Sequence, residues 1–210
     1  TFGQALRDLS LRTPVNVNDL AELAALGGQL GIEVPNLLRF TEVMAAMGVT
    51  TNMSATEAAQ GFARFANIMR TPQDDFERLG NIVVELGNNL ATTESEILRF
   101  GTRLAPIGRI VGMTEEEVFG LSAALTSLGV PAERGGTALQ KWFILAKQAV
   151  DSGGESLETF ARVAGMTADE FGKLFRESPA RAMAVFVKGL DEMNSAGMNV
   201  FGTLESLGLA

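Results

Sequence analysis

The sequence predicts an all-α fold, a multi-helix bundle of about ten to twelve short helices joined by short loops. Apolar residues return at three- and four-residue intervals along most of the chain. Polar residues that can cap a helix precede these stretches, and glycines follow them. Alternation with a period of two, which would indicate strands, is hard to find. The three observations together favour helices throughout.

Apolar stripes mark the face that each helix is expected to bury. Three long stripes are Phe76, Leu79, Val83, Leu86 and Leu90; Ile97, Phe100, Leu104, Ile107 and Val111; and Val118, Leu121, Leu125 and Leu128. Shorter ones are Phe62, Phe65 and Met69, and Met183, Phe186, Leu190 and Met193. Helices are expected at about 4–12, 18–30, 35–47, 54–70, 74–91, 94–111, 115–128, 135–150, 155–164, 168–176, 179–193 and 197–207.

Capping boxes mark several of the expected helix starts. In such a box a Ser or Thr side chain accepts a hydrogen bond from a free backbone amide, and an acid three residues later reaches back. Four boxes occur: Ser54 with Glu57, Thr93 with Glu96, Thr114 with Glu117, and Thr167 with Glu170. These pairs fix where their helices begin.

Glycine and proline punctuate the same pattern. Helix ends are expected at Gly31, Gly48, Gly112, Gly129 and Gly165, because glycine adopts the left-handed conformation at little cost. Helix starts are expected near Pro35, Pro72, Pro131 and Pro179, the last after a Ser178 cap. Pro106 lies inside the sixth expected helix and is expected to kink or divide it. Glycines inside helices, such as Gly61 and Gly120, each lower helix stability by about 1 kcal/mol relative to Ala. Either close contacts between helices or a need for marginal stability would explain their presence.

The chain is expected to contain a helical core over residues 1–150 and an additional helical segment over 151–210, either separate or part of the same domain. The residues from Asp151 to Gly154 are the most linker-like, although a tight interhelical loop fits them equally. GMTEEEVFGL from Gly112 resembles GMTADEFGKL from Gly165. Without a fixed period this is interpreted as shared helix-start pattern, not a repeat array. The chain opens on Thr1, not Met, and is therefore interpreted as a stretch of a longer protein.

Missing residue types narrow the chemistry. With His 0, Cys 0 and Tyr 0 there is no imidazole, thiolate or phenol, so the usual bases, nucleophiles and metal ligands are lost. We expect no catalytic residue, no metal site and no cofactor. The acidic groups Asp74, Asp75 and Glu77, and Glu115 to Glu117, lie in expected first turns, where they complement the helix dipole.

Charge and hydropathy limit the partners. The net charge is −8, and the 17 Lys and Arg form no cluster along the sequence, so direct nucleic-acid binding is not expected. Arg99, Arg103 and Arg109 fall at helical intervals and are interpreted as solvated helix faces. The longest apolar runs are far shorter than the roughly 20 residues that span a bilayer.

Two alternative functions stay open at this point. Glu is followed by Ser at Glu94, Glu155, Glu177 and Glu205, and lysozyme-like transglycosylases carry such a pair around one catalytic Glu. A cell-wall lytic glycosidase working through Glu177 is therefore one alternative, although a chain with one Trp and no Tyr has few aromatic platforms for sugars. A channel component that inserts into a membrane is the other.

Six residues are candidates for binding a partner protein: Gly129, Val130, Gly135, Gly136, Thr137 and Trp142. Gly135, Gly136 and Thr137 precede an expected helix, where such a turn can hold a phosphate, but no GKS or GKT motif accompanies them. A tight connection is the simpler interpretation. Trp142, beside Phe143, could anchor a partner or pack in the core.

One stretch resembles a known family. The sequence GMTEEEVFGLSAALTSLGVPAERGGTALQKW, from Gly112 to Trp142, resembles the core region of tail tape measure proteins of long-tailed phages and prophages. The shared parts are Gly112 to Glu117, Leu128 to Val130, and Gly136 to Leu139. MSATEAAQGFARFANIM from Met53 and LGNNLATTESEILRFGTRLA from Leu86 are similar to the family's preceding helices. The resemblance covers most of residues 15–150.

The resemblance implies a structural virion protein without catalytic residues. Such a protein helps to set tail length, fills the lumen of the tail tube and leaves during DNA ejection. Its implied partners are the tail tube protein, tail-tip or baseplate hub proteins, a tail assembly chaperone and further copies of itself in a homo-oligomer. It would lie in the virion tail, and in the bacterial host cytoplasm during assembly, with membrane contact only during ejection. The membrane alternative is then a host-membrane channel component of the ejection machinery, which inserts after ejection.

Overall fold

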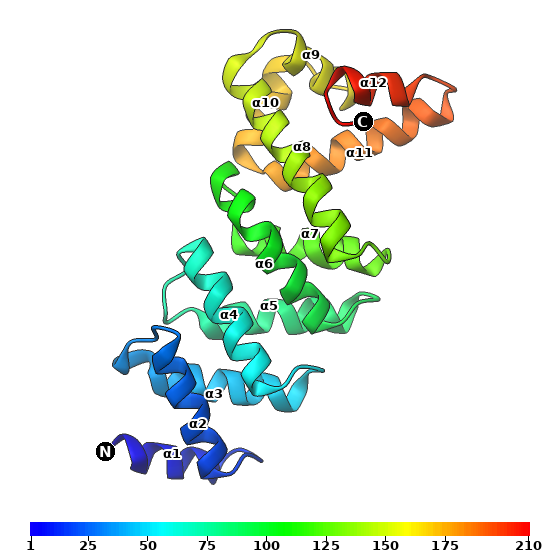
Figure 1. Cartoon of the computed structure of the whole chain (residues 1–210). Coiled ribbons are helices and arrows are strands. Elements are labelled where there is room, and N and C mark those ends of the chain that lie inside the picture. The colour runs from blue at the N-terminus through cyan, green and yellow to red at the C-terminus, as the bar shows by residue number, and fades with distance from the viewer. The chain divides into compact units, whose positions relative to one another are not determined.

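The computed structural model describes residues 1–210 as helices joined by short turns, without a strand (Figure 1). The all-α fold class and each of the expected helices are confirmed. The twelve helices are α1 (Phe2–Ser10), α2 (Val17–Gln29), α3 (Val34–Thr50), α4 (Ala55–Met69), α5 (Phe76–Asn89), α6 (Glu94–Val111), α7 (Glu115–Ser127), α8 (Ala132–Ser152), α9 (Gly154–Val163), α10 (Ala168–Glu177), α11 (Pro179–Ser195) and α12 (Val200–Ser206).

The helices form two compact units. Unit 1 comprises Thr1–Pro106 and Phe119–Ala132, and unit 2 comprises Ile107–Val118 and Glu133–Ala210. Helix α6 passes from unit 1 to unit 2 after Pro106, and α7 passes back after Val118. Of the linker-like residues from Asp151 to Gly154, only Gly153 lies between α8 and α9, inside unit 2, because α8 ends at Ser152 and α9 begins at Gly154. The expected division of the chain after residue 150 stays a prediction.

Unit 1 is a serial stack. Among α1 to α5, most helices pack against both the next helix and the one after it, and Figure 1 shows these helices following one another in sequence order. Edge-to-face contact joins Phe40 of α3 to Phe76 of α5, with ring centroids 4.8 Å apart. Phe65 of α4 stacks on Phe119 of α7 at 4.2 Å. Small local contacts thus hold the stack together along its length.

Unit 2 is organised around one side chain. Trp142 of α8 is 4% exposed, and its ring lies between 4.9 and 6.2 Å from four phenylalanine rings. These belong to α8, α9, α10 and α11: Phe143, Phe160, Phe175 and Phe186. The indole Nε1 has no hydrogen-bond partner among the protein's own atoms, so the ring is held by aromatic packing.

All four predicted capping boxes are present as reciprocal hydrogen bonds. The Ser54 hydroxyl accepts from the Glu57 amide at 3.1 Å, and the Glu57 carboxylate accepts from the Ser54 amide at 2.8 Å. Glu117 has a second role inside unit 2, because its carboxylate also accepts from the hydroxyl of Ser178, the cap of α11. A local sequence signal therefore also ties together two helix starts that are distant in the chain.

Four of the five predicted glycine stops are confirmed. Gly31, Gly112, Gly129 and Gly165 have φ between 68° and 87°, and the apolar residue after each donates its amide to a carbonyl five residues back, for example Met113 to Gly108 at 2.8 Å. Gly48 was expected to end its helix, but α3 continues to Thr50. The ending comes instead from Thr51, whose hydroxyl donates to the Met47 carbonyl.

Two further expectations need correction. The stripe from Val118 to Leu128 is buried only in part: Val118 is fully buried, but Leu128 is 78% exposed. Phe119 and Ala123, which lie outside the stripe, are also fully buried. Leu and Ala on several sides of this helix made its periodicity ambiguous. Pro106 does not divide α6, which runs unbroken from Glu94 to Val111.

No helix combines the length and the apolar character needed to cross a membrane.

Several helix-interior glycines lie where two helices approach closely. A Cβ on Gly189 of α11 would stand 1.7 Å from the Val163 carbonyl oxygen, and one on Gly61 of α4 would stand 2.5 Å from Leu98. Gly28 and Gly120, in contrast, face open space. Close contact accounts for the first two, and nothing in the structure explains the last two.

Candidate functional site

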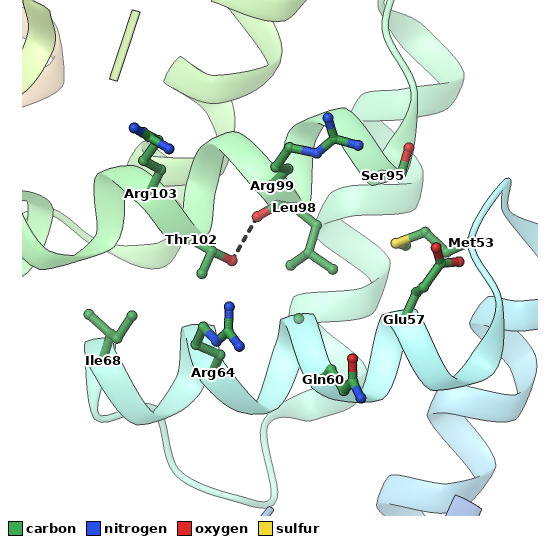
Figure 2. Close-up of a pocket in the computed structure, with 11 residues that line it drawn as sticks. Met53, Glu57, Gln60, Arg64, Ile68, Ser95, Leu98, Arg99, Thr102 and Arg103 are labelled. Carbon is green, nitrogen blue, oxygen red and sulfur yellow. Dashed lines mark hydrogen bonds between the residues drawn. The ribbon is translucent and has the colours of Figure 1, made fainter. Parts of the chain in front are cut away.

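A groove with a volume of about 540 Å³ lies in unit 1, between α4 and the first part of α6. The two helices run side by side in the same direction, from the Met53 and Ser95 end to the Ile68 and Arg103 end (Figure 2). We call this site the α4–α6 groove. Its lining residues are Met53, Glu57, Gln60, Gly61, Arg64, Ile68, Ser95, Leu98, Arg99, Thr102 and Arg103.

The floor of the groove is apolar. Leu98 points from α6 toward α4 in Figure 2 and is 4% exposed. It fits there because Gly61 has no side chain, since a Cβ at Gly61 would stand 2.5 Å from the Leu98 Cδ2 atom. Met53 is also buried, and Ile68 is half-buried. The close approach of the two helices thus leaves an apolar strip between their polar rims.

Hydrogen bonds fix one end of the groove. The Asn52 side-chain amide donates to the Ser95 hydroxyl at 2.8 Å, and the Ser95 amide donates to the Asn52 side-chain oxygen at 3.2 Å. Glu57, at the same end, is held in its capping box with Ser54. The loop before α4 is therefore locked to the start of α6, which sets the register of the two helices.

Arginines dominate the charge of the groove. Arg64 points from α4 into the gap toward α6, and Arg99 and Arg103 lie one turn apart on α6 (Figure 2). Glu57 is the only carboxylate among the lining residues. Arg64 makes no hydrogen bond or ion pair, and all three arginines are exposed. The groove is a locally positive surface on a chain whose net charge is −8.

The carboxylates beside the groove are held in their charged form. The backbone amide of Ser54, then its hydroxyl, lowers the pKa of Glu57 below its ordinary value of 4.5, and the positive charge of Arg99 adds to this. The hydroxyl of Thr93, then its amide, lowers the pKa of Glu96 in the same way. Because hydrogen bonding favours the ionised carboxylate, both caps stay charged at neutral pH.

The six predicted partner-binding residues do not gather on one surface of either unit. Gly129 and Val130 belong to unit 1, at the exposed C-terminal end of α7, and the other four belong to unit 2. Thr137 is exposed, whereas Gly135, Gly136 and Trp142 are buried. The structure therefore supports the core interpretation of Trp142. Partner binding at these six residues stays a prediction.

The expected turn before a helix at Gly135 to Thr137 is wrong. Helix α8 begins at Ala132, directly after Pro131, so these residues lie inside the helix. The Thr137 hydroxyl donates to the Glu133 carbonyl within the same helix at 3.1 Å. Two adjacent glycines suggested a loop, but the proline two residues before Glu133 sets the start. The turn that could have held a phosphate is absent.

Glu177, the candidate for a glycosidase mechanism, lies exposed at the end of α10, 3.8 Å from Lys173. It lines neither the α4–α6 groove nor the smaller cavity of about 170 Å³ in unit 2. No second carboxylate opposes it across a cleft, as glycoside hydrolysis by paired carboxylates would require. The structure gives this alternative no support.

The α4–α6 groove is not predicted from the sequence. Arg99 and Arg103 are exposed, as expected for solvated helix faces. Arg64 is far from them in sequence, so no local pattern connects the three arginines. The basic residues form no cluster along the chain, yet three of them line the groove where α4 and α6 lie side by side. The one available signal was Gly61, a costly glycine within a helix, which marks the close approach of α6.

The fold and the groove define an all-helical protein with an arginine-lined surface site. No group of acidic side chains in it could hold a metal ion. The chain belongs to the family of phage-related minor tail proteins, whose model matches residues 3–205. It is therefore a structural component of a phage tail, as the resemblance implied. No curated protein and no solved structure is similar enough to this chain to support a further comparison.

Proposed function

We propose that the chain is a segment of a tail tape measure protein, which helps to set tail length, fills the tail tube and is released during DNA ejection. The observation that carries the proposal is the ordered series of helix starts and turns from Gly112 to Trp142, which resembles the tape measure core. It lies within a chain that belongs to the minor tail protein family over residues 3–205.

The way the helices are built supports this role. Short helices carry their own caps and glycine ends, so each helix is defined locally along the chain. In unit 1 the contacts connect near neighbours in sequence, and such a serial stack can be opened step by step. A protein that must occupy a narrow tube and then leave it would benefit from this property.

Tail length gives a direct test. A phage carrying an in-frame deletion of these 210 residues is compared with wild type, and with a phage in which the segment is duplicated, by negative-stain electron microscopy of the tails. We expect shorter tails after deletion and longer tails after duplication. A fully extended helix of this length would change the tail by about 300 Å, at 1.5 Å per residue.

The size of the change distinguishes two forms of the segment. A change near the value for an extended helix means that the segment forms one continuous helix in the tube. A much smaller change means that its compact units persist there. Tails of unchanged length in both phages, with normal assembly, would refute the tape measure role.

A further inference from the structure

We propose that the α4–α6 groove binds an acidic amphipathic helix of a partner protein, with apolar side chains on the groove floor and carboxylates paired with Arg64, Arg99 and Arg103. This proposal does not depend on the tape measure role. It specifies one binding surface on a tail component and the chemistry of its occupant.

Charge complementarity selects the occupant. Three of the eleven lining residues are arginines, and the one carboxylate, Glu57, is already engaged in its capping box. Arg64 points into the gap without any partner of its own (Figure 2). A guanidinium offers paired N–H donors that match a carboxylate, so an acidic ligand would use the donors of Arg64 that the chain itself leaves unused.

The spacing of the lining residues suits a helix. On α4 the residues Glu57, Gly61, Arg64 and Ile68 follow one another at intervals of about one turn. They span about 16 Å, the length of roughly three helical turns. Leu98 and Ile68 provide an apolar strip along this length, which is the arrangement that receives the apolar ridge of a docked helix.

The same lining argues against a nucleic acid. No aromatic side chain is among the lining residues, so single-stranded bases would have nothing to stack on. Phosphate tracking needs a row of cations along a backbone, whereas here three cations line a groove with an apolar floor. A carboxylate-bearing helix uses both the floor and the rims.

The test measures binding of a synthetic acidic amphipathic peptide of about 14 residues, long enough for the groove, with Leu on one face and Glu on both flanks. The protein has no cysteine, so Gln60→Cys in the groove and Gln29→Cys at an exposed position of α2 give two singly labelled proteins. We expect a fluorescence change for the groove label and none for the α2 label. Binding should weaken as salt rises from about 0.05 to about 0.5 M.

Charge reversal then locates the contacts. The triple variant Arg64→Glu, Arg99→Glu, Arg103→Glu is compared with Arg134→Glu, Lys141→Glu, Arg181→Glu, which changes the net charge equally at exposed positions of unit 2. We expect the groove variant to lose about tenfold or more in affinity and the control to lose less than about twofold. Arg64→Glu alone, at a residue without internal partners, should lose about threefold while keeping the wild-type circular dichroism spectrum.

Three results would overturn the proposal. The first is equal loss of affinity in the groove variant and the unit 2 control. The second is equally tight binding of a peptide with Lys in place of every Glu, or of a single-stranded oligonucleotide. The third is no binding of the acidic peptide at any concentration up to about 1 mM, a threshold for very weak association.

Discussion

Units 1 and 2 have the same kind of helices but are held together differently. Unit 1 relies on several small contacts in series, such as the ring pairs Phe40–Phe76 and Phe65–Phe119. Unit 2 brings rings from four helices around the single Trp142. Similar capped helices are thus held by a distributed core in one unit and by a central core in the other, and we expect the cooperativity of unfolding to follow the type of core.

A distributed core also leaves room for surface function. In unit 1 the space between parallel α4 and α6 is only partly filled by Leu98, and the remainder is the α4–α6 groove. Unit 2 instead surrounds Trp142 with four phenylalanine rings, and its cavity, of about 170 Å³, is smaller than the groove. We therefore expect binding in unit 1 and concentrated stability in unit 2, and the following predictions test that contrast.

Trp142→Ala should have the largest effect, lowering the free energy of unfolding of unit 2 by about 3–5 kcal/mol because a buried aromatic ring is replaced by a cavity. Amide hydrogen exchange measured by mass spectrometry should accelerate together in α8, α9, α10 and α11. Phe40→Ala in unit 1 is the comparison, and its effect should concentrate in α3 and α5. Exchange that accelerates only in α8 of the Trp142 variant would show that the core is not central.

Gly189→Ala should have the next largest effect on stability, because the new Cβ would stand 1.7 Å from the carbonyl oxygen of Val163. A carbonyl group of the backbone cannot move aside as a flexible side chain can. We expect a loss of about 1–3 kcal/mol or more in unit 2. Gly61→Ala in unit 1 is the matched case, since its Cβ meets the flexible end of Leu98. Urea titration of both variants should show the smaller loss for Gly61→Ala, and equal losses would contradict the geometry.

Much of this fold is readable from the sequence because its helix signals are local. Each capping box lies within four consecutive residues, so Thr93 with Glu96 could be identified without knowing what packs above them. Proline starts such as Pro179 are equally local. Errors arose where a signal has two structural meanings. Gly48 can end a helix or admit a neighbour, and here it admits α4, whose Ala55 amide nitrogen would be 2.7 Å from a Cβ.

The candidate site was hidden for the opposite reason. The α4–α6 groove depends on the parallel packing of two helices that are not consecutive, and no local pattern encodes which faces then meet. Arg64 has the same sequence context as any exposed helical arginine. Trp142 shows the same limit, because the sequence allowed either an anchor or a core residue and only its four ring neighbours decide for the core.

Arg70→Gly should raise the stability of unit 1 by about 1 kcal/mol. Arg70 ends α4 with φ 61°, the left-handed region, where other helices of this chain place glycine. A side chain in this conformation costs roughly 1–2 kcal/mol of stability. Glycine removes that cost, but its greater freedom in the unfolded chain offsets part of the gain. Gly165→Ala in unit 2, at φ 68°, should lower stability by a similar amount. Thermal melts that move in the same direction for both variants would contradict this interpretation.

Lowering the pH should have the smallest effect on the free energy of unfolding, and this effect should occur in both units. The pKa values of Glu57 and Glu96 in unit 1, and of Glu170 in unit 2, lie below the ordinary value of 4.5 because cap amides and hydroxyls donate to the ionised carboxylates. A lowered native pKa means that the unfolded chain takes up protons first as the pH falls. The stabilisation is therefore complete well above pH 4.5 and is lost as the pH falls from about 5 through the lowered native values.

Urea titrations at pH 7 and at pH 4, with α4, α6 and α10 followed by hydrogen exchange, would measure this loss. Glu57→Gln with Glu96→Gln should weaken the pH dependence of unit 1 while leaving that of unit 2 in place, because the Thr167 box with Glu170 remains intact. Gln can still accept the capping hydrogen bonds, so the helices should persist and only their response to acid should change. An unaltered pH dependence in unit 1 would mean that carboxylates other than the caps govern its acid stability.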